Sequence, residues 1–224
     1  MKPKSIGALA ATSAPGEPVT RAPYGSQSDR REKAKAATRS RLLTATCETM
    51  LRSVRGDIKV EDIVSAASVS RATFYLHFPS IDDALAAVRS DMTALLDGEY
   101  AKLAAIGRVD NRALERWLED MLGMCREHRA MIIALMRTRN LSAADFDARL
   151  YYHGVIERLG VSHEAFRVAH ERSEVRAQAL LLLLQIEGLI RYFVVAEGGD
   201  EEPAMVRQIA EDLRRFIDAR TRRS

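Results

Sequence analysis

Residues 70–78, SRATFYLHF, gather side chains that can bind a polyanion into one short segment. Arg71 can hydrogen-bond a guanine edge bidentately, and Thr73 can bond a base or touch the methyl group of a thymine. Tyr75 and His77 are two residues apart, which is about 200° around a helix, so at most one of them can point straight into a groove. Phosphate contacts suit these two residues better. The segment therefore has the chemistry of nucleic-acid binding.

Two of these residue types have a structural interpretation as well. His77 falls near the expected end of a helix, where an imidazole can interact with the helix dipole without touching DNA. Phe74 and Phe78 are four residues apart, so they share one helical face and are predicted to be core residues. For His77 both interpretations remain open.

The surrounding sequence predicts two short helices that meet at a sharp turn. In VEDIVSAASVSRATFYLHFP, residues 60–79, apolar residues recur at intervals of three and four from Val60 to Ala67, which indicates one buried helical face. Ser70 has the side-chain oxygen that caps a new helix beginning at Arg71. Pro79 ends this helix, because the residue before a proline is pushed out of helical geometry.

A longer helix near residues 33–53 precedes the pair and is predicted to pack across it. Its expected buried residues are Leu42, Leu43, Cys47, Met50 and Leu51. Three helices of which the last two form such a pair make a helix-turn-helix unit. The second helix of the pair fits the major groove of DNA.

Charge is concentrated toward the same end of the chain. The net charge is +3, and residues 28–80 hold ten Lys or Arg against six acids, whereas residues 81–224 are net acidic. This asymmetry favours a polyanionic partner for the N-terminal part, although an ordinary solvated surface accounts for the charge equally well. A basic run could form an arm along DNA or be merely solvated; it consists of Arg30, Arg31, Lys33 and Lys35.

Composition and motifs exclude several other classes of protein. With 224 residues, 47% of them hydrophobic, the chain can bury a core. Cys47 and Cys125 are far apart and outside any metal-ligand spacing, which fits a reducing cytoplasm and predicts no metal and no cofactor. No HExxH, GxSxG or P-loop string occurs, so an enzyme is not expected. The apolar residues 179–195 contain Gln185, Glu187 and Arg191, which favours a buried helix over a membrane span.

Strand-like alternation is missing, and the fold class is therefore predicted to be all-α, with about nine helices. Prolines and glycines crowd the start, so residues 1–27 are interpreted as a disordered tail. Residues 28–80 are the helix-turn-helix domain, and residues 81–224 form a larger helical domain for ligand binding and dimerisation. One of the expected helix breaks is at Asp97–Gly98.

The segments TRSRLLTATCETM and VEDIVSAASVSRATFYLHFPSIDDAL resemble the N-terminal domain of the tetracycline-repressor (TetR) family of bacterial transcription regulators, over roughly residues 36–88. The resemblance implies a homodimeric repressor that a small molecule releases from its operator. It also implies a DNA-binding segment at the positions of Ser70, Arg71, Thr73, Tyr75 and His77.

Three positions depart from that family's pattern. Ser68 stands where a Gly is usual, so a positive φ there costs about 1 kcal/mol. Lys59 stands where a capping Thr or Ser is usual; it loses the cap but can reach a phosphate as a point charge. Ile81 replaces a Lys that commonly touches phosphate, which predicts one missing backbone contact.

The C-terminal half is expected to supply dimerisation and sensing. Residues 175–196 are apolar nearly all round, and Met205, Ile209, Leu213 and Phe216 follow at helical spacing, so two helices per subunit would make a four-helix interface. Candidate ligand contacts are Trp117, Met121, Met124 and Cys125 on one helical face, with Tyr151, Tyr152 and Gln185 as polar anchors. An apolar stripe of this spacing is more often core than pocket.

The predicted function is a cytoplasmic, sequence-specific DNA-binding regulator that responds to a small apolar or amphipathic effector. Its partners are an operator in double-stranded DNA, a second copy of itself and the effector, with no membrane. The alternative is a nucleoid-type protein that binds DNA without sensing a ligand.

Overall fold

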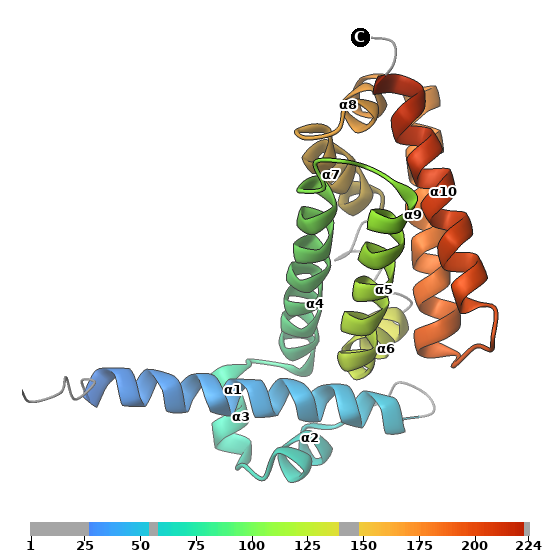
Figure 1. Cartoon of the computed structure of the whole chain (residues 1–224). Coiled ribbons are helices and arrows are strands. Elements are labelled where there is room, and N and C mark those ends of the chain that lie inside the picture. Colours follow the sequence, from blue (N-terminus) through green and yellow to red (C-terminus); the bar gives the residue numbers. More distant parts are fainter. Residues whose placement is uncertain (1–26, 54–57, 139–147, 222–224) are drawn as a thin grey trace, which may run out of the picture. The chain divides into compact units, whose positions relative to one another are not determined.

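The computed structural model describes residues 27–53, 58–138 and 148–221, and within these ranges all regular structure is helical (Figure 1). The all-α prediction is confirmed. The chain divides into two compact units between Ala37 and Thr38. Except for Gln27, the expected tail lies outside the described residues.

Three helices form the helix-turn-helix unit: α1 (Gln27–Arg52), α2 (Val60–Ala67) and α3 (Arg71–His77). The bounds of α2 and α3 are those that the sequence predicts. Ser70 precedes α3 in an extended conformation, and its Oγ accepts a hydrogen bond of 3.0 Å from the backbone N–H of Thr73. This satisfies one of the free amides at the helix start. Phe78, before Pro79, is extended and ends α3.

The turn between α2 and α3 depends on a left-handed residue that is not glycine. Ser68 has φ 52° and ψ 49°, and its N–H returns to the carbonyl of Ser65. The next N–H, from Val69, donates to the carbonyl of Val64 at 3.0 Å. Paired bonds of this kind close a helix C-terminus in a Schellman-like arrangement, for which glycine is the favoured residue. The cost of about 1 kcal/mol that a positive φ brings to a residue other than glycine therefore applies at Ser68.

We therefore expect Ser68→Gly to stabilise the protein by about 0.5–1 kcal/mol. Glycine removes the strain of the left-handed conformation, and part of this gain is offset because glycine loses more backbone entropy on folding. Thermal unfolding should show a rise in Tm of about 1–4 °C. The matched control is Ser65→Gly, an exposed position inside α2, which should lower Tm. A decrease in Tm for Ser68→Gly would contradict this account.

Two separate sets of buried side chains make up the hydrophobic core. The small core joins α1, α2 and α3 to the first half of α4 and to one residue of α6. It consists of Leu42, Leu43, Ala45, Cys47, Met50, Val60, Ile63, Ala67, Phe74, Phe78, Ala84, Leu85, Val88 and Ala134. Four of the five residues expected to be buried in the first helix belong to it; Leu51 is only half-buried.

The helix α4 (Ile81–Ala104) runs through the break expected at Asp97–Gly98. Glycine in a helix interior costs about 1 kcal/mol relative to alanine, but burial on both sides of Gly98 outweighs this cost. Met92 is buried before it, and Tyr100 and Leu103 are buried after it. The continuous α4 therefore contributes its first half to the small core and its second half to the large core.

The remaining helices build the large core. They are α5 (Asn111–Glu127), α6 (Arg129–Thr138), α7 (Ala148–Gly160), α8 (Glu164–Glu171), α9 (Ser173–Ile190), the π-helical η1 (Arg191–Val195) and α10 (Glu202–Thr221). The described residues thus hold ten α-helices, one more than about nine. One further break, between α8 and α9, falls on Arg172, which is extended and is neither Gly nor Pro.

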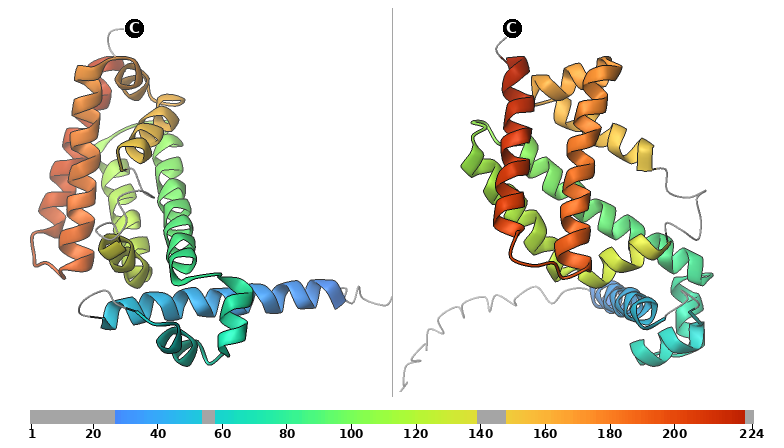
Figure 2. Two further views of the ribbon diagram at one scale, coloured as in Figure 1. Left: turned by 180° about the vertical axis from the view of Figure 1, so that it is seen from behind. Right: turned by 90° about the vertical axis from the view of Figure 1, so that its right-hand side faces the viewer.

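The last two long helices, α9 and α10, lie side by side (Figures 1 and 2). The segment Ser173–Val195 is long and apolar enough to cross a membrane, and 44% of its most apolar window is buried inside the protein. Its buried side packs into the large core, whereas Leu181 and Leu184 on the other side are exposed. The single chain therefore covers one side of this helix and leaves Leu181 and Leu184 open.

Helix α10 also differs from its expected orientation. Ile209, Leu213 and Phe216 are buried within the same chain, and Phe216 packs edge-on against Phe166 of α8, with ring centroids 5.2 Å apart. In this apolar series only Met205 is exposed. The periodicity of α10 was a correct indication of a buried face, but that face belongs to the chain's own core.

Candidate nucleic-acid interface and buried polar cluster

The short helix α3 buries one side and leaves the other open. Phe74 is fully buried, while Arg71, Tyr75 and Leu76 are exposed, Leu76 by 76%. An exposed leucine beside an arginine and a tyrosine can contact a thymine methyl group. Sequence reasoning missed Leu76, because leucine usually indicates core. Its position, about 200° around the helix from Phe74, was the available signal.

Arg71 is held from two sides. Its guanidinium Nη1 donates to Oε1 of Glu61, which lies in the first turn of α2, and both side chains remain more than half exposed. The hydroxyl of Tyr75, one turn further along α3, raises the pKa of Arg71, and the carboxylate of Glu61 adds to this. The guanidinium is thus charged and pairs with Glu61 at the start of α3.

Ser70 and Thr73 are brought together by the helix cap. Their hydroxyl groups are 2.9 Å apart, in addition to the bond from the Thr73 amide to Ser70. The Thr73 hydroxyl therefore has a local partner, and its methyl group is the part that the cap does not engage. A base contact by Thr73 stays a prediction.

The structure places the other expected DNA contacts at the ends of helices. Lys59 is exposed immediately before α2 and makes no side-chain cap bond, as the sequence predicts. His77 is the last residue of α3 and half-buried, with its ring 6.4 Å from that of Phe78. Neither interpretation of His77 is decided by this position.

The basic run before the boundary at Ala37 lies on the exposed first turns of α1. It consists of Arg30, Arg31, Lys33 and Lys35. A contact of these side chains with DNA stays a prediction.

A cluster of rings and one carboxylate lies inside the large core. Tyr100 of α4 packs against Trp117 of α5, with ring centroids 6.0 Å apart. Tyr151 and Tyr152 of α7 are in edge contact at 5.4 Å, and the Tyr152 hydroxyl donates to Glu187 of α9. Burial raises the pKa of Tyr100 and of Tyr151, and Tyr100 also senses the charges of Tyr151, Tyr152 and Glu187. Four helices thus contribute to one aromatic-polar cluster.

Whereas Glu187 is only half-buried, Glu99 is a buried carboxylate in the same region. Its residue is 4% exposed; Oε1 accepts from Lys102 Nζ at 2.7 Å, and Oε2 has no hydrogen-bond partner among the described residues. Its backbone carbonyl accepts from Trp117 Nε1 at 2.8 Å. Sequence reasoning missed Glu99, because a glutamate before a lysine at helical spacing usually indicates a solvated face.

The expected ligand contacts are only partly brought together. Trp117, Met121 and Cys125 are buried on one face of α5, and Met124 packs at the edge of the same core. Gln185 instead lies on the exposed side of α9, next to Leu184. The polar group that contacts Tyr152 is Glu187, and a ligand contact by Gln185 stays a prediction.

Burial makes the thiols of both cysteines unreactive toward disulfide reagents. Desolvation raises the pKa of Cys47 and of Cys125 to about 12. Only about one thiol in 10⁴ is then ionised at pH 8, and the thiolate is the reactive form. We expect a chromogenic disulfide reagent to label neither thiol of the native protein within minutes, and both after unfolding in guanidinium. Rapid labelling of one thiol in the native protein would show that one of the cores opens.

Residues 56–88 match the family model described as bacterial regulatory proteins, tetR family. No curated protein matches the chain in sequence. The fold is similar to that of a transcriptional regulator of the TetR/AcrR group from Aquifex aeolicus VF5, at a TM-score of 0.56 and 20% identity, covering 79% of this chain and 97% of that one. A TetR-like transcriptional regulator from Rhodococcus sp. RHA1 is similar at a TM-score of 0.53 and 20% identity, covering 79% of this chain and 94% of that one. Residues 56–88 thus have the sequence pattern of the TetR-family DNA-binding segment, and the all-helical fold of the chain is similar to that of TetR-type transcriptional regulators.

Proposed function

We propose that the protein is a cytoplasmic repressor that binds a near-palindromic operator as a homodimer and leaves it when a small apolar or amphipathic effector binds. The observation that carries this proposal is the surface of α3, where Arg71, Tyr75 and Leu76 are exposed while Phe74 anchors the helix in the small core. Such a helix can read the major groove, with Lys59 and the end of α3 near the phosphates.

The proposed dimer interface is the exposed face of α9, extended by the start of α10. Leu181 is 62% exposed, Leu184 50%, Tyr192 44% and Met205 37%. Leu181, Leu184 and Gly188 follow one another at helical spacing, and a side chain added at Gly188 would meet nothing within 4 Å in its own chain. This space allows a partner helix to approach closely. A second copy is the natural occupant, because two-fold interfaces pair a surface with itself.

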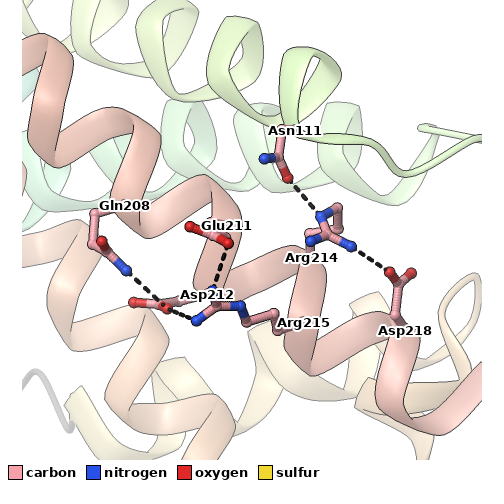
Figure 3. A network of polar contacts seen from close by, with 7 residues as sticks. All are labelled: Asn111, Gln208, Glu211, Asp212, Arg214, Arg215 and Asp218. Carbon is pink, nitrogen blue, oxygen red and sulfur yellow. Dashed lines mark hydrogen bonds and ion pairs between the residues drawn. The ribbon is translucent and has the colours of Figure 1, made fainter.

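The exposed side of α10 beyond Met205 carries charges of both signs (Figure 3). Asp212 accepts from Gln208 Nε2 at 3.1 Å and lies 3.9 Å from Arg215, which also pairs with Glu211 at 2.5 Å. Because a two-fold axis brings α10 against its own copy, an acid and a base on one face can pair in both directions. The neighbouring Arg214 is tied to Asn111 of α5 at 2.6 Å and braces α10 from inside the chain.

The proposed effector site is the aromatic-polar cluster of the large core. Trp117 and Tyr100 offer apolar faces, Met121, Met124 and Cys125 lie on the adjoining helix face, and Tyr151, Tyr152 and Glu187 offer polar groups. Binding sites for small molecules are mostly apolar with a few polar groups that orient the ligand. Trp117 is the only tryptophan, so its fluorescence reports on this cluster alone.

Helix α4 supports the coupling of effector and operator. Ala84, Leu85 and Val88 are part of the small core, whereas Tyr100 is in the aromatic-polar cluster. A second link is α6, where Ala134 enters the small core and Arg129 donates to the carbonyls of Val194 and Val195 in η1 at 2.8 and 3.2 Å. An effector shifts the dimer only as far as it prefers one conformation, and a coupling of about 1–3 kcal/mol is typical.

The test is a footprint on the DNA around the protein's own gene, followed by effector titration. We expect two protected half-sites whose centres lie about 34–36 Å apart, or a multiple of this distance. A compound that quenches Trp117 fluorescence should also reduce operator affinity. Uniform coverage of DNA, with no half-sites and no compound that affects binding, would instead favour a nucleoid-type protein.

A further inference from the structure

Glu61 is an acidic residue at a place where DNA would repel it. It lies in the first turn of α2, more than half exposed, and its carboxylate meets the guanidinium of Arg71 at the start of α3. The other acid in that turn, Asp62, is exposed as well, and Arg71 pairs with Glu61. A carboxylate beside a surface that must approach phosphates weakens binding to every sequence. Its presence calls for a compensating gain.

Stability does not supply that gain. Exposed ion pairs contribute little to folding, because solvent screens the attraction and two long side chains lose freedom. The Glu61–Arg71 pair also adds nothing to the small core, since both side chains lie outside it. The gain must therefore come from the effect of the ion pair on the Arg71 side chain.

An arginine that reads guanine must place two N–H groups of its planar fork in line with O6 and N7. The guanidinium has five N–H donors, and Glu61 engages Nη1. Four N–H donors lie beyond this contact, and two of them on one edge of the fork are enough for a guanine. Tyr75, in the next turn of α3, raises the pKa of Arg71 and so favours its charged form, which the contact with Glu61 orients. The orientation of the fork is thus set before DNA arrives.

We propose that Glu61 is a specificity-determining residue, which acts by positioning the Arg71 guanidinium for bidentate readout of a guanine. It increases discrimination between bases at the position that Arg71 reads, and it lowers affinity for all DNA through its negative charge. This proposal rests on the proposed function, because it requires that α3 reads a sequence.

The experiment selects sequences from a pool of random double-stranded DNA with the full-length protein. The dissociation constants of the selected site and of its single-base variants are then measured by fluorescence anisotropy at one fixed salt concentration. The proteins are wild type, Glu61→Gln, Arg71→Ala and the double variant. Asp62→Asn is the matched control, since it removes the same charge from the neighbouring exposed position. Circular dichroism checks that each variant is folded.

We expect Glu61→Gln to lose about tenfold of base preference at the same position where Arg71→Ala loses it, while both variants keep their preference elsewhere. The double variant should lose no more preference than Arg71→Ala alone, because the two residues act as a unit. Glu61→Gln should also bind random DNA more tightly than wild type. Asp62→Asn should tighten binding to all sequences while leaving the preference unchanged.

Two outcomes overturn the proposal. If Glu61→Gln tightens binding with its base preference intact, Glu61 acts only as a repulsive charge. If the preference changes at a different base position from that of Arg71→Ala, Glu61 contacts the DNA itself. A wild-type protein that selects no sequence would overturn the proposed function together with this inference, so the two failures are distinguishable.

Discussion

Replacing Leu181 and Leu184 together by Glu is expected to convert the protein from a dimer into a folded monomer that no longer binds its operator. Both side chains are at least half exposed in the single chain, so two carboxylates there leave the large core intact. In a dimer the same carboxylates would be buried against a second copy, which costs several kcal/mol per charge when no partner is present. Light scattering at micromolar concentration gives the mass, and anisotropy with operator DNA gives the affinity.

The control for this experiment is Val161→Glu. Val161 follows α7, is 87% exposed and lies outside the proposed interface, so the variant should remain a dimer with wild-type operator affinity. A monomeric wild-type protein, or a dimer that survives the double substitution, would contradict the proposed interface. Charges at Leu213 and Phe216 would not be informative, because both side chains are buried inside the chain and the variants would unfold.

The helix-turn-helix was predictable because its limits are set by local signals. Ser70 caps α3 through its own side chain, and Pro79 prevents its continuation, so neither limit depends on distant parts of the chain. The turn at Ser68 is local as well, because only three residues separate α2 from α3 and the N–H of Ser68 bonds within α2. Breaks without such signals were missed. Arg172 separates α8 from α9 with no glycine or proline.

The direction in which an apolar helix faces was not predictable. In α10 the periodicity indicates one buried face, but it cannot say whether the same chain or a second copy covers it. The structure assigns Ile209, Leu213 and Phe216 to the chain's own core and leaves Leu181 and Leu184 of α9 exposed. Long-range packing decides this, and a single sequence does not contain it.

Some residues of the candidate sites could be identified from the sequence, whereas others depend on contacts that only the tertiary fold creates. Arg71 and Tyr75 could be identified by residue type, and the structure exposes both. Glu61 could not, because its contact with Arg71 spans ten residues and forms only when the two helices meet. Glu187 was recognised only as a charge that disfavours a membrane span, and its contact with Tyr152 of α7 depends on the tertiary fold.

Because the small and large cores are separate clusters, damage to one should leave the other's function in place. Phe74 is fully buried in the small core, with its ring 5.9 Å from that of Phe78. Truncating a buried phenylalanine to alanine typically costs about 3–5 kcal/mol, a large part of the total stability of about 5–15 kcal/mol. We expect Phe74→Ala to lower operator affinity at least tenfold at 25 °C, because α3 is then no longer held against α1 and α2.

The same variant should remain a dimer and keep the Trp117 fluorescence of the wild type, since Leu181, Leu184 and the aromatic-polar cluster lie in and around the large core. Phe166→Ala is the matched control: Phe166 is equally buried, but in the large core, against Phe216. It should weaken the dimer and change the Trp117 signal.

Among the described helices, α4 is the one that contributes several residues to each core, so the experiment also measures how strongly α4 couples them. If Phe74→Ala dissociated the dimer as readily as Phe166→Ala, the two cores would unfold as one unit. The coupling free energy through α4 would then be far larger than the proposed value of about 1–3 kcal/mol.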